Sequence, residues 1–311
     1  MEPNVQTVKI GVAHRGAGLA PVFAALEGGY LREQGLEPEL VSASGHAGAL
    51  QSLFAGDVDF INSVGPAVIL ANARHNGDAI VIASASARST QQICARPGLT
   101  SRDELRGKRW GVTARNDPDE CTILMAFERW NWSIADVDIV VVGSDRPRLE
   151  LLLNADNVDV AIMHAPEPFQ ARKRGWNVVE DLARMDVAMQ NSCAVTTRRL
   201  LKERPDTALR YARAYCKGVY RFRTDAEFGL ALLRKYLSES DEAVLKQTWL
   251  ALARAMGGMM FPSVEGMRNA GALLHRLGAL TKPVSAEDAI DLELIATAER
   301  EGFFETFMGR P

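Results

Sequence analysis

The chain repeats a pattern of residues at a spacing of one hundred positions. The run KIGVAHR from Lys9 to Arg15 is echoed by RWGVTAR from Arg109 to Arg115. Further residues match at the same spacing: Val41 with Val141, Ser44 with Ser144, Leu53 with Leu153, Ala55 with Ala155, Val58 with Val158, Asp59 with Asp159, Pro66 with Pro166, Ala71 with Ala171 and Arg74 with Arg174. An ungapped spacing over this distance indicates two similar lobes, and two similar lobes generally hold a ligand between them.

Each repeat alternates short β-rich runs with segments of helical spacing, which predicts parallel sheets covered by helices on both faces. In the first repeat we expect strands at 8–13, 37–42, 60–62 and 79–84, and helices at 21–34, 45–55 and 65–75. In the second we expect strands at 109–113, 138–142 and 158–163, and helices at 118–130, 146–154 and 167–174. The start of the 118–130 helix is well marked, because Asp117 can cap it and Pro118 suits its first position.

Two apolar segments, 91–95 and 193–196, follow the two repeats and are predicted to be hinge strands between the lobes. After Thr197 only helical spacing remains, at 207–223, 227–236, 242–256, 264–277 and 285–304. We expect this tail to pack on the first lobe. The resulting domain prediction assigns 1–90 and 196–311 to lobe one, and 91–195, with the hinge strands, to lobe two.

Composition limits the classes of partner. The net charge of −3 offers no basic excess for nucleic acid, and no apolar run is long enough to span a bilayer. The four cysteines, Cys94, Cys121, Cys193 and Cys216, show no CxxC spacing, which argues against a structural zinc site. The N-terminal residues do not form a secretory signal, so we expect a cytoplasmic protein, or a periplasmic or extracellular one whose signal was removed.

The order of several stretches resembles a known family. They are VKIGV (8–12), PVFAALEGGY (21–30), GLEPEL (35–40), LFAGDVDF (53–60), DELRGKRWGV (103–112), EPF (167–169) and LLKERP (200–205). Together they resemble the NMT1-like solute-binding proteins of ABC importers for sulfonates, nitrate, taurine and thiamine-pyrimidine precursors, a group that also includes fungal-type pyrimidine synthases. The resemblance extends over nearly the whole chain.

The resemblance implies the type II periplasmic-binding-protein fold, with two α/β lobes joined by two crossing strands and a ligand in the cleft. It implies a solute-binding protein that captures a small polar or anionic organic molecule, such as a sulfonate, a carboxylate or a pyrimidine-like compound, by hinge closure. Its expected partners are that ligand and the permease subunits of an ABC importer. We expect a monomer.

The loops that leave the carboxyl ends of the strands are the expected ligand site, since ligands of open α/β sheets bind there and helix N-termini favour anions. Lobe one and the hinge contribute glycines, hydroxyls, imidazoles and arginines: His14, Arg15, Gly16, Ser44, Gly45, His46, Ser63, Gly65 and Arg88. For Ser44 the alternative is a helix cap, and for Arg88 a hinge salt bridge.

Lobe two contributes Asn116, Asp117, Ser144, His164 and Glu167 to the expected site. Asp117 is better explained as a helix cap, and Glu167 has a structural alternative. If either carboxylate faces the ligand, the ligand carries donors or a positive group. Positions at which the two repeats differ, such as Gly16 against Asn116 and Val64 against His164, are where we expect ligand choice to be determined.

A cytoplasmic enzyme on the same fold is the alternative function: a decarboxylase, desulfinase or lyase that uses His14, His46 or His164. The loop after the first strand lacks the cysteine of a desulfinase-like relative, and no lysine between Lys9 and Lys108 could hold pyridoxal phosphate. Cys121 is expected to be buried as a small apolar residue. We therefore predict no catalytic residue, no cofactor and no metal site, and we expect hydrogen bonding to ligand from the histidines.

Overall fold

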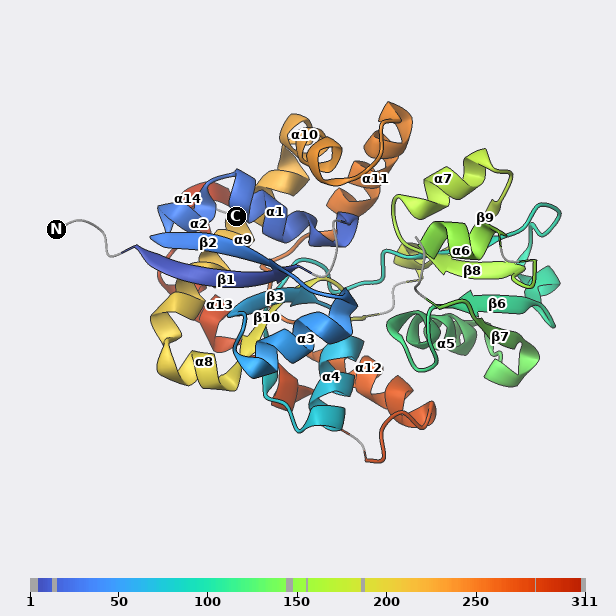
Figure 1. The fold of residues 1–311 in the computed structure, drawn as a ribbon, viewed down its shortest axis with the longest axis horizontal. Coiled ribbons are helices and arrows are strands. Elements are labelled where there is room, and N and C mark those ends of the chain that lie inside the picture. The colour runs from blue at the N-terminus through green and yellow to red at the C-terminus, as the bar shows by residue number, and fades with distance from the viewer. Residues whose placement is uncertain are drawn as a thin grey trace.

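The computed structural model describes residues 5–12, 16–143, 148–154, 156–185, 188–282 and 284–308. Figure 1 shows two α/β lobes side by side, with the C-terminal helices around the first. Lobe one contains the strands β1 (Gln6–Val12), β2 (Leu36–Ser42), β3 (Phe60–Ser63), β4 (Ala79–Ser84) and β10 (Cys193–Thr197). Lobe two contains β5 (Gln92–Ala95), β6 (Arg109–Val112), β7 (Asp138–Val141), β8 (Val160–Met163) and β9 (Asn177–Asp181). The expected α/β fold class is confirmed.

The two sheets have the same topology. Their strand orders are β2-β1-β3-β10-β4 and β7-β6-β8-β5-β9. In each sheet one strand runs antiparallel to the others: β10 between β3 and β4, and β5 between β8 and β9. These two strands are the ones that enter each sheet from the other lobe, so the chain crosses between the lobes just before each of them.

The expected hinge strands therefore lie inside the sheets. The crossing segments are 85–91 and 188–192, which are joined by backbone hydrogen bonds such as Asn191 N–H to the Ser86 carbonyl at 3.0 Å. The strand that begins at Cys193 pairs with lobe one, so the lobe boundary expected after residue 195 falls earlier. Cys94 and Cys193 belong to different sheets and are not neighbours in one hinge ribbon, and all four cysteines are buried free thiols.

The pairing of strands shows at which positions the sequence repeat is kept in the structures of the two lobes. Ile10 pairs with Phe60 in lobe one, and Trp110 pairs with Val160 in lobe two, so the spacing of one hundred holds at both strands. At the neighbouring strand it slips by one residue: Gly11 pairs with Val41, but Gly111 pairs with Val140. Val141 is therefore not the counterpart of Val41, and the repeat is not free of gaps.

Helices cover both faces of both sheets. In lobe one these are η1 (Ala17–Leu19), α1 (Ala20–Glu27), α2 (Tyr30–Glu33), α3 (Gly45–Ala55) and α4 (Gly65–His75). In lobe two they are η2 (Arg102–Leu105), α5 (Pro118–Trp130), η3 (Ile134–Asp136), α6 (Arg148–Asn154), α7 (Glu167–Lys173) and η4 (Leu182–Arg184). The single helix expected at 21–34 is split, because Gly29 adopts a φ of 73° that ends α1 before α2 begins.

The C-terminal segment is helical, as expected. It comprises α8 (Arg198–Glu203), α9 (Pro205–Thr224), α10 (Ala226–Tyr236), α11 (Glu242–Ala255), α12 (Val264–Arg276), η5 (Ala286–Ala289), α13 (Glu293–Arg300) and α14 (Glu305–Met308). Helix α9 packs against α1 in the core of lobe one, where Tyr211 stacks on Phe60. Helix α12 packs against α4 on the other face of the same sheet.

The tail also reaches lobe two, which the sequence did not predict. Helix α11 contacts α7, and α12 contacts α5. Gln170 of α7 donates to Glu239 at 2.7 Å, and Lys173 forms an ion pair with Asp241. Arg276 of α12 forms an ion pair with Glu128 of α5. The C-terminal helices thus join the lobes by polar contacts outside the hinge.

Among the described residues, no helix is both long enough and apolar enough to cross a membrane.

Candidate functional site

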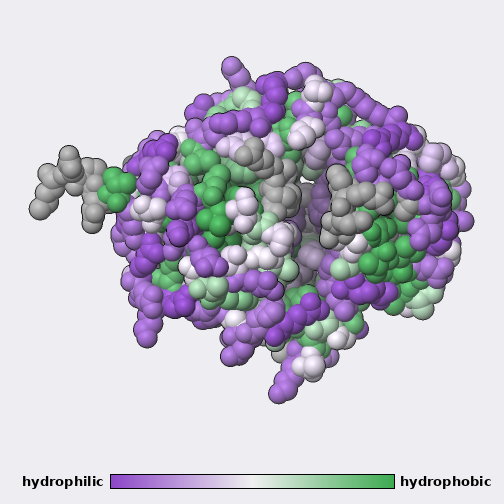
Figure 2. Space-filling view, viewed as in Figure 1, coloured by the Kyte–Doolittle hydropathy of each residue, from purple (hydrophilic) through white to green (hydrophobic). Residues whose placement is uncertain are grey.

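The candidate site lies where the carboxyl ends of the strands in both lobes approach the crossing segments. Figure 2 shows the surface hollowed between the two lobes. Three of the expected site residues, His14, Arg15 and Ser144, lie outside the described residues. The remaining eleven lie within the described parts of the chain.

The loops of lobe one present glycine, hydroxyl and imidazole groups. Gly16 is half-buried and precedes η1, and its carbonyl accepts the Leu19 N–H at 3.0 Å. Ser44 is exposed at the start of α3, but its side chain makes no capping hydrogen bond, so the cap alternative is wrong for this hydroxyl. Gly45 follows with a φ of 65°, a conformation that favours glycine.

His46 connects two of these loops. Its Nδ1 lies 3.4 Å from Oγ of Ser63, which is fully buried at the end of β3. Gly65, in the next turn, is also buried, and its N–H donates to the Gln190 carbonyl at 2.7 Å. A Cβ at Gly65 would lie 2.6 Å from Sδ of Met267 and 2.9 Å from Cβ of Gln190. Gly65 therefore packs against the hinge and α12.

Asn62 supports this part of the site from the end of β3. It is 4% exposed, and its Nδ2 donates to the Gly18 carbonyl at 3.1 Å and to Oγ of Ser192 at 3.3 Å. The Tyr215 hydroxyl donates to its Oδ1 at 2.8 Å. One amide thus fixes the loop after β1, the second crossing segment and α9 relative to one another. An asparagine at the end of a buried strand is the only sequence signal for it.

The N-terminus of α5 in lobe two carries three acidic residues. Asp117 caps the helix, as expected: its Oδ1 accepts the Glu120 N–H at 2.8 Å, and its Oδ2 accepts the Ala114 N–H at 3.0 Å. Glu120 is fully buried, accepts the N–H of Asn116, and lies 2.7 Å from the Arg115 guanidinium. Asn116 itself has a φ of 59°. These carboxylates are engaged by the protein's own donors.

Burial next to these carboxylates also determines the chemistry of Cys121. The thiol is fully buried, and desolvation raises its pKa well above the usual value, with further increases from Asp117 and Glu120. A thiol in this state is not a nucleophile at neutral pH. The expectation that Cys121 is a buried apolar residue is confirmed.

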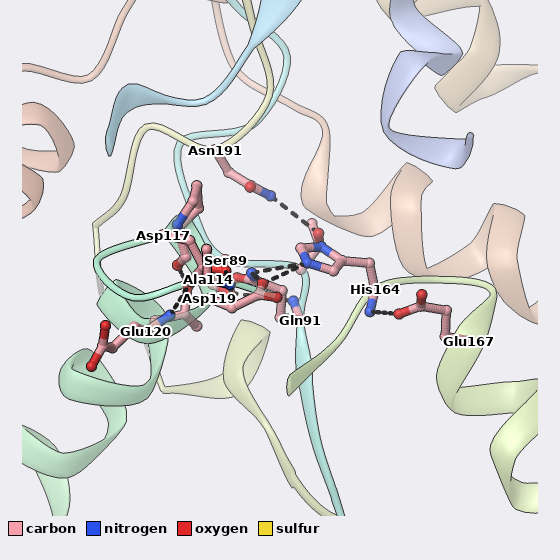
Figure 3. Close-up of polar contacts among 12 residues, drawn as sticks. Ser89, Gln91, Ala114, Asp117, Asp119, Glu120, His164, Glu167 and Asn191 are labelled. Carbon is pink, nitrogen blue, oxygen red and sulfur yellow. Dashed lines mark hydrogen bonds and ion pairs between the residues drawn. The ribbon is translucent and has the colours of Figure 1, made fainter. Parts of the chain in front are cut away.

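His164 lies at the end of β8 and approaches the first crossing segment, as Figure 3 shows. Its Nε2 is 2.9 Å from Oδ1 of Asp119, which is 5% exposed, and 3.4 Å from Nε2 of Gln91. Its backbone N–H donates to Oε2 of Glu167 at 3.0 Å. Glu167 therefore supports the turn into α7, as its structural alternative predicted.

Asp119 and Gln91 were not selected from the sequence. Asp119 lies in the first turn of the helix predicted at 118–130, and Gln91 begins the strand predicted at 91–95. Their contact with His164 requires β8, α5 and the crossing segment to meet, and no local pattern reports that. Arg88 is exposed on the same crossing segment and pairs through its backbone with Ala188.

The described residues contain no group of three or more His, Cys, Asp or Glu side chains with the geometry to hold a metal ion. The side chains described at the candidate site are hydrogen-bonding groups. Backbone and hydroxyl groups lie on the lobe-one side, and an imidazole held by a buried carboxylate lies on the lobe-two side.

Many solved structures share this fold. A putative periplasmic sulfonate-binding protein SsuA of Methylobacillus flagellatus KT superposes with a TM-score of 0.77 at 18% identity, covering 98% of this chain and 97% of that one. The alkanesulfonate-binding protein SsuA of Xanthomonas axonopodis pv. citri, bound to MOPS, gives 0.76 at 14% identity, with coverages of 94% and 99%. The desulfurization enzyme DSZB gives 0.66 at 17% identity, with coverages of 95% and 99%.

At these identities the likeness shows the fold alone, and it confirms the expected periplasmic-binding-protein architecture. No curated protein matches the sequence. A family model described as "NMT1/THI5 like" matches residues 17–225, which is more than half of the chain. The protein therefore belongs to the NMT1/THI5-like family.

Proposed function

We propose that this protein is a solute-binding protein that captures a small polar or anionic organic molecule between its lobes by hinge closure. The observation that carries the proposal is the shared topology of two sheets joined by two crossing segments, with polar loops at the strand ends beside them. A ligand that contacts both lobes stabilises the closed arrangement, since binding selects the state with more contacts.

The groups proposed to contact the ligand are Gly16, Ser44, Gly45, His46 and Ser63 from lobe one, Arg88 from the hinge, and Asn116 and His164 from lobe two. His14, Arg15 and Ser144 remain part of the proposal on sequence grounds. The hydroxyl of Ser44 and the start of α3 carry no side-chain cap, so this helix N-terminus has donors for an oxyanion.

The permease subunits of an ABC importer are the proposed recipients of the ligand, acting outside the cytoplasm. Family membership and the fold shared with the SsuA proteins support this assignment. The closed shape of the two lobes would be the form that such a permease recognises.

A thermal-shift screen of the wild-type protein tests the proposal. The panel contains MOPS, taurine and methanesulfonate as sulfonates, benzoate and propionate as carboxylates, and thymine and ethylamine as compounds without an anionic group. A binder should show a melting temperature that rises with ligand concentration. Mass spectrometry of the recovered ligand should find it unchanged. No shift with any compound would contradict the proposal.

The hydrogen bond between His164 and Asp119 favours a second candidate, an enzyme that uses this imidazole as a general base. A base oriented by a buried carboxylate is common to many catalytic sites. Conversion of a bound compound into a new product in the same mass-spectrometric assay would support the enzyme, and unchanged ligand would support the solute-binding protein.

A further inference from the structure

We propose that the two lobes part on the side where α7 faces α11, while α5 stays seated on α12, so that the ligand enters the cleft from the α7 side. The inference rests on the proposed function and adds the direction of opening and the route of entry. The C-terminal helices contact lobe two at both places. Figure 1 shows α7 and α11 above the crossing segments and α5 and α12 below them.

The contact of α5 with lobe one is apolar. Cys121 and Met125 lie one turn apart on the same face of α5. Cys121 is fully buried in a cluster whose other buried members belong to lobe one and its C-terminal helices. Met125 packs with Leu273 of α12 and Met189 of the second crossing segment, and these three residues are at most 5% exposed. Separation of α5 from α12 would return this apolar surface to water, which is unfavourable.

Helix α12 also holds the second crossing segment to lobe one. Oε1 of Gln190 accepts the Ser263 N–H at 2.7 Å, and Nε2 of Gln190 donates to Oγ of Ser84, at the end of β4, at 2.9 Å. Nδ2 of Asn269 donates to the Ala188 carbonyl at 2.8 Å. These bonds join α12, the crossing segment and β4, so α12 offers α5 a fixed surface on which lobe two can turn.

The contact of α7 with α11 and the segment before it is polar. The Lys173 and Asp241 side chains, which pair here, are 51% and 36% exposed. A groove of about 200 Å³ lies between the two helices, lined by Phe169, Arg172, Lys173, Ala243, Val244 and Gln247. Water can replace the polar contacts as the lobes part, so this side is easier to separate than the α5 side.

The ion pairs themselves do not cause this difference. An exposed ion pair joins the lobes on each side, Lys173 with Asp241 near α11 and Glu128 with Arg276 between α5 and α12. Exposed pairs of this kind contribute little to stability. The difference therefore lies in what surrounds each pair, a buried apolar cluster on the α5 side and a groove on the α7 side.

Movement of α7 would also uncover part of the candidate site. Helix α7 begins at Glu167, directly after the loop that leaves the end of β8. Oε2 of Glu167 accepts the His164 N–H at 3.0 Å, so the loop is tied to the first turn of the helix. When α7 parts from α11, a path opens toward this strand-end loop.

Pulsed electron resonance on the ligand-free protein tests the direction of opening. Arg174→Cys with Lys246→Cys places spin labels at exposed positions of α7 and α11, and Arg129→Cys with His275→Cys places them on α5 and α12. The four native cysteines are buried. The distances between α7 and α11 should be more broadly distributed, and extend further, than those between α5 and α12. Equal widths, or a broader distribution across α5 and α12, would overturn the proposal.

Cross-links on the two sides test the route of entry. Lys173→Cys with Asp241→Cys, bridged by a short bismaleimide, should slow association of every panel compound that raises the melting temperature by about tenfold or more, because the open form becomes inaccessible. Stopped-flow tryptophan fluorescence measures the rates.

The matched control is Glu128→Cys with Arg276→Cys, which bridges the other exposed ion pair between the lobes with the same reagent. Its association rates should equal those of the unbridged variant. Equal slowing by both bridges, or slowing by the control bridge alone, would contradict entry from the α7 side.

The two experiments separate this inference from the proposed function. If no panel compound bound, the proposed function would fail, and the ligand-free distances would still decide the direction of opening. If compounds bound and the bridge between α7 and the segment before α11 did not slow their association, solute binding would stand and the route of entry would fail.

Discussion

Asp159 binds Arg109 through both backbone and side chain. Its Oδ2 accepts the Arg109 backbone N–H at 3.1 Å, and its two oxygens bind Nε and Nη2 of the guanidinium at 2.8 Å each. Asp59 accepts the Lys9 N–H at 2.9 Å in the same way, one hundred positions earlier. The spacing of the repeat thus corresponds to the same contact in both lobes: a carboxylate before β3 or β8 accepts a backbone N–H of the neighbouring strand, β1 or β6.

The first prediction concerns the stability that this contact contributes. The hydrogen bond from Arg109 is the main cause that lowers the pKa of Asp159, against an opposing effect of burial. Asp159→Asn should lower the free energy of unfolding at pH 7 by about 1 kcal/mol, a value discounted for the exposed guanidinium. Chemical denaturation measures the change, with Asp103→Asn, whose side chain is 88% exposed, as the control.

The pH dependence of that difference follows from the direction of the shift. A carboxyl whose pKa is lowered by folding stabilises the protein above its unfolded pKa, about 4, and loses that contribution as pH falls through the folded value. The wild-type advantage over Asp159→Asn should therefore shrink below about pH 4. A difference that stayed constant from pH 7 to pH 3 would contradict the role of the charged pair.

The second prediction concerns two equivalent glycines, Gly11 on β1 and Gly111 on β6. A Cβ at Gly111 would lie 2.8 Å from Cδ2 of Leu152, and one at Gly11 would lie 2.9 Å from Cγ2 of Ile61. Alanine at either position forces the core apart and should lower the free energy of unfolding by about 1–3 kcal/mol. Gly18→Ala is the control, because nothing lies within 4 Å of its added Cβ. Equal melting temperatures for all three variants would count against this packing.

The third prediction concerns the contacts between α7 and the loop before α11. Lys173 pairs with Asp241 across the lobes, whereas its neighbour Arg174 pairs with Glu150 inside lobe two, at 2.8 Å. Lys173→Ala should shift the free protein toward more open forms, because it removes an ion pair that links α7 of lobe two to the segment before α11. Small-angle scattering should then give a larger radius of gyration. Arg174→Ala should not change it.

Lack of any increase in Lys173→Ala would show that the pair does not hold the lobes together. Stability is not the readout here, because both pairs are about half-exposed and such pairs contribute little to it.

Local signals predicted most of the fold. Asp117 and Pro118 marked the start of α5, and the α/β alternation of the first repeat matched all of its strands. The strand β9 was missed because it is half-buried along its whole length and shows no alternation. The single helix predicted at 21–34 included Gly28 and Gly29, although two adjacent glycines are a local signal for a helix break.

The strand-end loops of the candidate site could be predicted from the sequence, but the contacts between their side chains could not. His164 lies at the end of β8, as its place in the predicted topology implied. Its partners Asp119 and Gln91 are 45 and 73 positions away in the sequence, and they meet it only through packing of α5 and the crossing segment. The same limit explains why the contacts of the C-terminal helices with lobe two were not expected.

The most direct test of hinge closure is a distance between spin labels in the two lobes. Gln51→Cys on α3 and Asp156→Cys after α6 place labels at exposed positions, while the four native cysteines are buried. Pulsed electron resonance is measured without ligand and at a saturating concentration of the tightest-binding compound of the screen. Hinge closure should shift the distribution to a single, narrower distance when ligand binds. An identical distribution in both samples, with binding confirmed by calorimetry, would contradict hinge closure.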